Sequence, residues 1–325
     1  MPTPSLLMIP SAFKSGVLAS VLPSDGAGDF TVSRPSTASR VNSDGIIETM
    51  AADVPRLDYS DGGCPVLLTE PQSTNDYLNS QAMVTQTTTT VADTYTVSFE
   101  GTGTIALSGT FTGSLVGTGV NDLVQLTFTS TAGALLSTVT GTVNEAQLEK
   151  LPYATSRIRT IGTTVTRLAD RIDGAGDVNT FNSEEGVFVI NIGKNDESDI
   201  KERDFSLSDG SVNNRVFIRY TQASRVTMYI IVDGITALSK SFIDVVNITD
   251  IHEYVFVWGL NKLALYIDGL EITPTTNTGV TFPPNTLSEI NFDRSDGNSP
   301  MYCKTKKLRV YKSIAEAQVD LPYIV

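Results

Sequence analysis

The chain has 325 residues, of which 40% are hydrophobic and only 18% are charged. This length allows two modest domains with packed cores and an additional segment. The formal net charge of −13 repels phosphate backbones and anionic membranes, so we expect no nucleic-acid partner. The apolar runs are broken well before the roughly 20 residues of a membrane-spanning helix, so we expect no membrane insertion.

Residues 1–80 contain Gly, Pro, Asn or Asp every few positions and only short apolar pieces, such as residues 66–68. A segment of this kind rarely builds its own core. We therefore expect an irregular arm that orders when it docks on another surface. The N-terminus has no basic start and no continuous apolar stretch, as a secretory signal would, which indicates synthesis in a cytoplasm.

Strand patterns begin after the run TQTTTT at 85–90. Tyr95, Val97 and Phe99 alternate with polar residues, and Val124, Leu126 and Phe128 do the same. With the Gly-rich turns between them, residues 85–155 predict about five strands in a small jelly-roll-like sandwich. The one helical candidate is NEAQLEKL, which starts at Asn144 and lasts barely two turns.

Residues 175–325 carry bulkier side chains and predict about eight strands of roughly five to seven residues in a second sandwich. The Asp-Gly pairs at 209–210, 233–234, 268–269 and 296–297 are typical of tight turns between strands. A short helix is expected from Ser313, because Glu316 follows at the spacing of a capping box. The chain is therefore predicted to be all-β, with an extended N-terminal arm followed by two β-sandwich domains.

The sequence offers no catalytic constellation. His252 is the only histidine, and it lies at a strand entry as a structural residue. The carboxylates Glu184 and Glu185 are typical of a solvated loop. The loop 193–204 offers oxygen ligands for Ca²⁺ but lacks the order of an EF-hand. We expect no enzyme, no catalytic residue and no cofactor, with Ca²⁺ at this loop as the alternative.

The two cysteines, Cys64 and Cys303, are far apart in the sequence and form no CxxC motif. Their spacing indicates neither a zinc site nor a disulfide framework. We expect both to be reduced, partly buried packing residues.

Aromatic residues concentrate in the C-terminal region, and sugar binding needs a flat apolar ring with hydrogen-bonding neighbours. Tyr266 alternates with Leu265 and Ile267, which makes it a surface candidate. Tyr302 and Tyr220 complete the set of candidate glycan contacts. Trp258 is assigned to the core.

Two segments resemble proteins of tailed bacteriophages. DFTVSRPSTASRVNSDGIIE and VPRLDYSDGGCPVLLTEPQSTN, within 29–75, resemble the N-terminal region of fibre and appendage proteins, including those of crAss-like phages of Bacteroidetes. NEAQLEKLPYATSRIRT, at 144–160, resembles the junction after the jelly roll in the same proteins. There the usual continuation is Tyr-Ile-Pro-Thr, whereas this chain has Arg157-Ile158-Arg159-Thr160.

A third resemblance covers FSLSDGSVNNRV, FVWGLNKLALYIDGLEI and INFDRSDGNSPMYCKTKKLRVYK, which are similar to a concanavalin A-like or laminin G-like sandwich. It carries no set of sugar-binding or calcium residues over to this chain. Fold alone does not give function, and many such domains mediate only assembly.

These resemblances together imply a structural virion protein, assembled in the host cytoplasm and located on the virion surface. The expected form is a homotrimeric head fibre or capsid-surface appendage, anchored to the capsid or another virion protein by its N-terminus and presenting lectin-like domains to host-surface glycans. The alternatives are a tail-fibre receptor-binding protein, a polysaccharide depolymerase and a structural clamp without a ligand.

Overall fold

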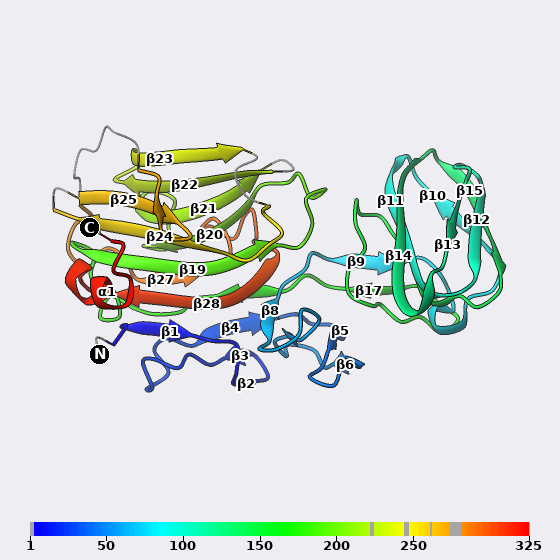
Figure 1. The fold of residues 1–325 in the computed structure, drawn as a ribbon, viewed down its shortest axis with the longest axis horizontal. Coiled ribbons are helices and arrows are strands. Elements are labelled where there is room, and N and C mark those ends of the chain that lie inside the picture. The colour runs from blue at the N-terminus through cyan, green and yellow to red at the C-terminus, as the bar shows by residue number, and fades with distance from the viewer. Residues whose placement is uncertain (1–2, 222–223, 244–246, 261, 274–280, 325) are drawn as a thin grey trace.

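The computed structural model describes residues 3–221, 224–243, 247–260, 262–273 and 281–324. It is almost entirely β-structure, as the sequence predicted. Figure 1 shows a large body that holds both termini and a small body of strands beside it. The chain leaves the large body after its N-terminal strands, forms the small one and then returns.

The large body is a sandwich of two antiparallel sheets. The first sheet has eight strands, in the order β26 (Leu270–Glu271), β25 (Lys262–Ile267), β24 (His252–Gly259), β19 (Gly186–Lys194), β28 (Cys303–Tyr311), β8 (Val66–Leu68) and β7 (Leu57–Asp58), with β1 (Leu6–Met8) also paired to β28. The second sheet has five strands, in the order β23 (Ile235–Ile243), β22 (Arg225–Val232), β21 (Arg215–Thr221), β20 (Arg203–Ser208) and β27 (Glu289–Asn291).

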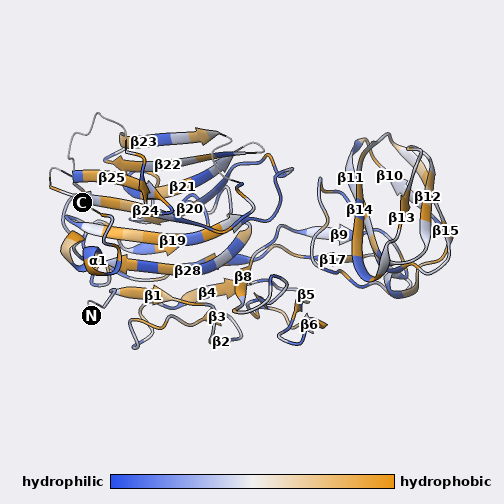
Figure 2. Ribbon diagram, viewed as in Figure 1, coloured by the Kyte–Doolittle hydropathy of each residue, from blue (hydrophilic) through white to orange (hydrophobic). Residues whose placement is uncertain are grey.

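Alternate side chains from the two sheets meet in one continuous core. Phe188, Phe205 and Phe256 stack there with ring centroids 5.8 Å apart in successive pairs. Trp258 is fully buried in this core, and its indole N–H donates to the carbonyl of Asn182, so its assignment as a core residue is confirmed. Figure 2 shows apolar residues along these strands and along β1 and β4 (Phe30–Ser33), which lie against them.

The N-terminal region is not the extended arm that we predicted. Its strands are short, but Leu6, Met8 and Phe30 are fully buried in the core of the sandwich. Leu6 pairs with Val310, at the other end of the chain. The segment builds no core of its own, as its composition indicated, because its apolar residues complete the core of the C-terminal sandwich instead.

Further short strands extend this N-terminal layer. They form a four-stranded sheet, in the order β18 (Arg171–Asp173), β4, β3 (Val17–Leu18) and β2 (Phe13–Lys14), and a hairpin of β5 (Ala38–Val41) and β6 (Ile47–Met50). Cys64 lies in this region and is exposed, against our prediction of partial burial, whereas Cys303 is buried; both are free thiols.

The small body has its own core around Tyr95, Val97, Phe99 and Phe128, whose inward alternation was predicted correctly. One sheet has the order β10 (Gln86–Thr90), β15 (Gly133–Thr140), β12 (Thr104–Gly109) and β13 (Gly113–Val116), and the other has the order β14 (Gly119–Ser130), β11 (Asp93–Gly101) and β16 (Asn144–Glu149). The helical candidate at Asn144 is wrong, because this segment is strand β16. It pairs with β11, and its residues 146–149 are buried there.

Two features connect the bodies. The strands β9 (Ser73–Asn75) and β17 (Val165–Arg167) form a two-stranded ladder along the connection. Next to it, buried Arg34, Arg56 and Arg167 bind the buried carboxylates of Glu70 and Asp170, and we call these five residues the junction cluster. Every member of the cluster is thus ion-paired, as buried charges require.

The helix α1 (Ile314–Asp320) covers part of the outer face of the eight-stranded sheet. Ser313 caps it by accepting a hydrogen bond from the backbone N–H of Glu316, as the sequence predicted. The helix and the C-terminal tail pack Ala317, Leu321 and Ile324 on the sheet in a separate apolar cluster. The helix and the tail therefore bury aromatic side chains that would otherwise be exposed on this face of the sheet.

Candidate functional site

The structure buries all three tyrosines that the sequence offered as glycan contacts. Tyr266 lies on the outer face of the eight-stranded sheet, as its parity predicted, but it is only 1% exposed. The C-terminal tail covers it, with the ring of Tyr323 centred 5.7 Å from its own. Alternation gives the face of a residue correctly but does not reveal what packs on that face.

Tyr220 and Tyr302 are also unavailable to a ligand in this structure. Tyr220 points into the core of the sandwich, where its hydroxyl donates to Tyr254. Tyr302 is 5% exposed and lies under the guanidinium of Arg203, 4.4 Å from its ring centroid. All three candidate glycan contacts are therefore buried, against the surface position that we expected for Tyr266.

The outer face of the five-stranded sheet carries a different aromatic group. Val216, Ile218 and Tyr220 of β21 point into the core, so Arg215, Phe217 and Arg219 lie on the opposite face. Phe217 pairs directly with Tyr229 on β22. The two rings stack almost in parallel, with centroids 4.5 Å apart and an interplanar angle of 4°.

Two arginines hold this ring pair in place. The guanidinium carbon of Arg215 lies 4.0 Å from the Phe217 ring centroid, and that of Arg219 lies 5.5 Å from it. Cation–π contacts at such distances are attractive. Phe217 is almost fully buried by these neighbours, whereas Tyr229 stays partly exposed.

Asp204 on β20 fixes one of these arginines. Its two carboxylate oxygens accept hydrogen bonds from Nε and Nη2 of Arg219, at 2.7 Å and 2.6 Å. This fork-like pairing raises the pKa of Arg219, while burial raises the pKa of Asp204 against the effect of the arginine. The side chains therefore form a row that crosses from Asp204 to Arg219, runs along β21 to Phe217 and crosses to Tyr229.

Small hydroxyl residues border the free side of this row. Ser239, on the edge strand β23, is the cross-strand partner of Tyr229 and is exposed. The neighbouring pair, Thr227 and Ser241, is joined by a hydroxyl hydrogen bond of 3.0 Å. Because Phe217 occupies one ring face of Tyr229, the other face is directed toward these small side chains. We call Asp204, Arg219, Phe217, Tyr229 and Ser239 the aromatic row.

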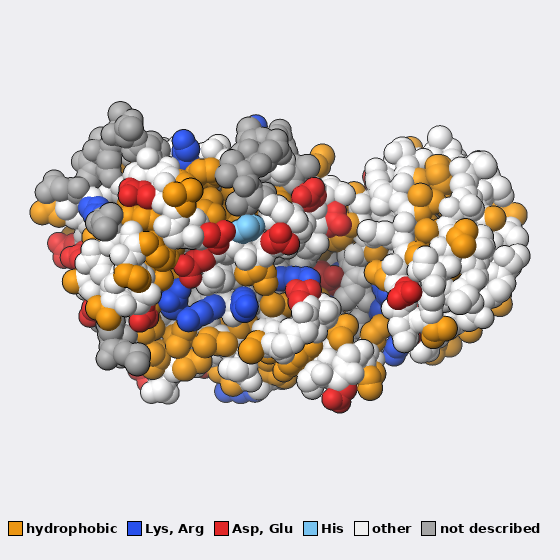
Figure 3. Space-filling view, in the orientation of Figure 1, with side chains coloured by type: hydrophobic (Ala, Val, Ile, Leu, Met, Phe, Trp, Pro, Cys, Tyr) orange, Lys and Arg blue, Asp and Glu red, His pale blue; other side chains and the backbone are white. Residues whose placement is uncertain are grey.

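The acidic loop and the single histidine form no such site. His252 bonds Asp268 at 2.6 Å and the carbonyl of Asn247 at 3.0 Å, which fits the structural role expected for it. It is the pale blue side chain near the centre of Figure 3. Asp199 in the loop 193–204 pairs with Arg203. Within the described residues, no group of three His, Cys, Asp or Glu side chains is placed to hold a metal ion.

Comparisons with known proteins give distant structural similarities. No protein-family model matches the sequence, and no curated protein matches it. The carbohydrate-binding module of a Ruminococcus gnavus sialidase, solved with sialyllactose, is 14% identical with a TM-score of 0.35, covering 45% of this chain and 90% of that chain. A Bacillus licheniformis β-glucanase is 18% identical with a TM-score of 0.31, covering 44% of this chain and 70% of that chain.

A Streptococcus pneumoniae NanB sialidase is 14% identical with a TM-score of 0.33, and the match covers 45% of this chain and 27% of the sialidase. Similarity at this level says nothing about a ligand, so the function has to be derived from the residues of this chain. Among the described residues, no helix is long and apolar enough to span a membrane.

Proposed function

We propose that this chain is a non-enzymatic glycan-binding protein and that the aromatic row is its binding surface. The observation that carries the proposal is the partly exposed ring of Tyr229, stacked on Phe217 and bordered by hydroxyl groups. A sugar ring has an apolar face that stacks on an aromatic ring and hydroxyls that need polar neighbours. Arg219 and Ser239 supply such neighbours on either side.

The ring pair is also held in place by its neighbours. Each ring is held by its cross-strand partner, and Arg219 is held by two hydrogen bonds to Asp204. A preformed surface loses little conformational entropy on binding, which favours affinity. The proposed role is therefore recognition without a chemical step.

The test is binding of the full chain to immobilised bacterial surface polysaccharides. We expect Tyr229→Ala to weaken binding by about tenfold, because the stacking surface is removed, and Tyr229→Phe to bind almost as the unchanged chain does. Tyr59→Ala is the matched control, since Tyr59 is also partly exposed but lies in the N-terminal layer. Equal binding by Tyr229→Ala and the unchanged chain would refute the site.

We further propose that the protein is an appendage of a phage virion, as the resemblance of residues 29–75 implies. In this proposal it is a homotrimer on the capsid surface, with a tail fibre as the alternative location. Because N-terminal strands complete the core of the sandwich, the anchor has to be sought on the outer surface of that layer and not by deleting residues 1–80. Exposed Phe13 on β2 offers such a position, and Phe13→Glu should reduce co-sedimentation with empty capsids while leaving glycan binding intact.

A further inference from the structure

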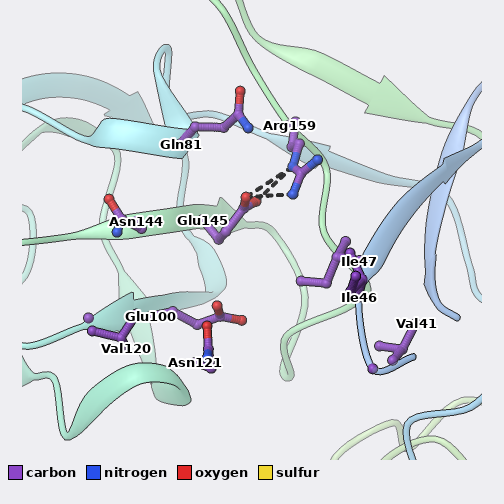
Figure 4. A pocket seen from close by; sticks show the side chains of 12 residues that line it. Val41, Ile46, Ile47, Gln81, Glu100, Val120, Asn121, Asn144, Glu145 and Arg159 are labelled. Atoms are coloured by element: carbon purple, nitrogen blue, oxygen red, sulfur yellow. Dashed lines mark hydrogen bonds and ion pairs between the residues drawn. The ribbon is translucent and has the colours of Figure 1, made fainter. Parts of the chain in front are cut away.

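A cleft separates the β5–β6 hairpin from the small body (Figure 4). Its volume is about 570 Å³, within the range of small-molecule sites. The hairpin forms one wall, and the other wall comes from β11, β14, β16 and the turn η1 (Ser80–Ala82). Segments far apart in the sequence thus meet around one open space.

The charged side chains of this cleft neutralise one another. Arg159 binds the carboxylate of Glu145 through Nε, at 3.0 Å and 3.1 Å, and through Nη2, at 2.8 Å. Glu100 accepts a hydrogen bond from Nη2 of Arg157 at 2.5 Å. Since both lining carboxylates are paired with an arginine, the cleft favours an uncharged ligand over an ion.

Three amide side chains line the cleft, two of them exposed and one half-buried. Gln81, Asn121 and Asn144 come from η1, β14 and β16. None of the three side chains has a hydrogen-bond partner among the residues that the structure describes. An amide offers both a carbonyl acceptor and two N–H donors, which is the combination that pairs with neighbouring hydroxyl groups.

Aliphatic side chains complete the lining. Ile46 is 61% exposed and stands with Ile47 and Val41 on the hairpin, while Val120 is 65% exposed on the side of the small body. Figure 4 shows the hairpin residues across the opening from the amides. The hairpin wall is therefore apolar, and the small-body wall combines polar side chains with Val120, so the cleft offers both kinds of surface to a sugar ring.

The backbone holds two of the lining residues in unusual conformations. Asn121 has φ +120° and Glu145 has φ +49°, both in the left-handed half of conformational space. Glu145 lies where the register of β16 against β11 shifts. Strained residues and irregular strand pairings recur at ligand sites, where they aim side chains that a regular strand would direct elsewhere.

We propose that this cleft is a second binding site, for a short neutral saccharide. The three amides bind its hydroxyls, and the aliphatic residues of the hairpin cover the apolar face of its ring. This goes beyond the function proposed above, because neither the aromatic row nor a virion is needed for it. Since the walls belong to both bodies, a bound sugar also links them.

The experiment uses the full chain with glucose, galactose, N-acetylglucosamine, lactose and cellobiose at millimolar concentration. Hydrogen exchange followed by mass spectrometry reports where each sugar protects backbone amides. We expect at least one of these sugars to slow exchange in both 41–47 and 119–121, the two sides of the cleft. If none of them slows exchange on both sides, the proposal is wrong.

Variants distinguish this site from the aromatic row. The double variant Asn121→Gly with Asn144→Ala removes two amides, and glycine accepts the positive φ without strain. We expect it to weaken binding of the protecting sugar by about tenfold. Asn285→Gly is the matched control, because Asn285 is also exposed and has φ +57°. Tyr229→Ala should leave the sugar's slowing of hydrogen exchange in 41–47 and 119–121 unchanged. If Tyr229→Ala abolishes that slowing, the sugar does not bind in the cleft, and the proposal is wrong even if the aromatic row binds a glycan.

Discussion

Arg56 is the residue on which the junction cluster depends most. Its guanidinium is fully buried and binds Glu70 on one side and Asp170 on the other. The backbone N–H of Glu70 also donates to Asp170, at 2.9 Å. Arg56 thus bridges the two carboxylates in the interior, and its loss would leave each with a single arginine, Arg34 for Asp170 and Arg167 for Glu70.

We therefore expect Arg56→Met to lower the free energy of unfolding by about 1.5–3 kcal/mol, the range for a hydrogen bond to a charged group, because both carboxylates keep a second arginine. Chemical denaturation monitored by circular dichroism measures this. Arg294→Met is the control, since Arg294 pairs with Asp296 at the surface and its removal should cost less than about 1 kcal/mol. Similar losses in the two variants would contradict this account of the cluster.

The same cluster predicts sensitivity to acid. Burial alone would raise the pKa of Glu70, but the charges of Arg167 and Arg56 outweigh it and lower the pKa to about 2. A carboxyl with a depressed pKa stabilises the fold above its unfolded pKa, near 4.5. We expect this contribution to be lost as the pH falls from about 4.5 to 2, and Glu70→Gln to remove that part of the pH dependence in denaturation curves.

The pKa of Asp173 on β18 shifts in the opposite direction to that of Glu70, so its charge destabilises the fold. Burial and the charge of Asp293 raise its pKa to about 6. An ionised Asp173 therefore destabilises the folded state at pH 7 but not at pH 2.5, which lies below both the folded pKa of about 6 and the unfolded pKa of 3.8. Asp173→Asn should raise the denaturation midpoint at pH 7 and leave it unchanged at pH 2.5. An equal shift at both pH values would show that the charge is not the cause.

At the scale of elements, β28 organises the eight-stranded sheet. It pairs with β19 along one side and with β1 and β8 along the other. The edge that it presents to β1 includes Leu308 and Val310, both fully buried. An uncovered apolar edge strand is a template for association with other chains.

Deleting residues 3–10 should therefore lower the thermal midpoint and cause concentration-dependent association. Differential scanning calorimetry and size-exclusion chromatography measure the two effects. Phe13→Ser is the control, because β2 is exposed and does not pair with β28. This variant should keep the thermal midpoint and stay monomeric. A truncated chain that stays monomeric with an unchanged midpoint would show that β1 is dispensable.

Local signals in the sequence predicted several elements correctly. Asp233 and Asp268 take positive φ before Gly234 and Gly269, as Asp-Gly turns require, and the cap at Ser313 forms as expected. The helix pattern at Asn144 failed, because pairing with β11 outweighs helix propensity in so short a segment. Local sequence therefore predicts turns and helix caps well, but it does not predict which distant strand a segment pairs with.

The candidate sites show the same limit. The alternation in β25 placed Tyr266 on the correct face, but only the three-dimensional structure shows that the C-terminal tail covers it. The sequence of β22 contains Tyr229, but it does not show that Phe217 of β21 stacks on it. The cleft could not be foreseen at all, since its hairpin wall and its small-body wall meet only after the two bodies have assembled.

At the scale of the whole molecule, the two bodies have separate hydrophobic cores. The core of the small body draws on residues from Tyr77 to Leu148, and the core of the sandwich uses none of them. Separate cores are the mark of units that unfold separately. The ladder of β9 and β17 keeps the two crossing segments together at the junction.

We expect a fragment of residues 72–162 to fold without the rest of the chain. Its proton spectrum should show dispersed signals, and the full chain should unfold in two calorimetric transitions, one of which matches the fragment. The fragment lacks Arg56 and Glu70, so its stability should not respond to pH as the full chain does. An unfolded fragment would mean that the sandwich is needed to order the small body.

The pairing of Leu6 with Val310 also governs the order in which the molecule can be completed. A ribosome must synthesise almost the whole chain before β28 exists to receive β1. Contacts between residues so distant in sequence raise the contact order, which slows folding. The small body, whose contacts are more local, can finish while the first strands still wait for their partner. We therefore expect chaperones to bind the N-terminal strands during synthesis.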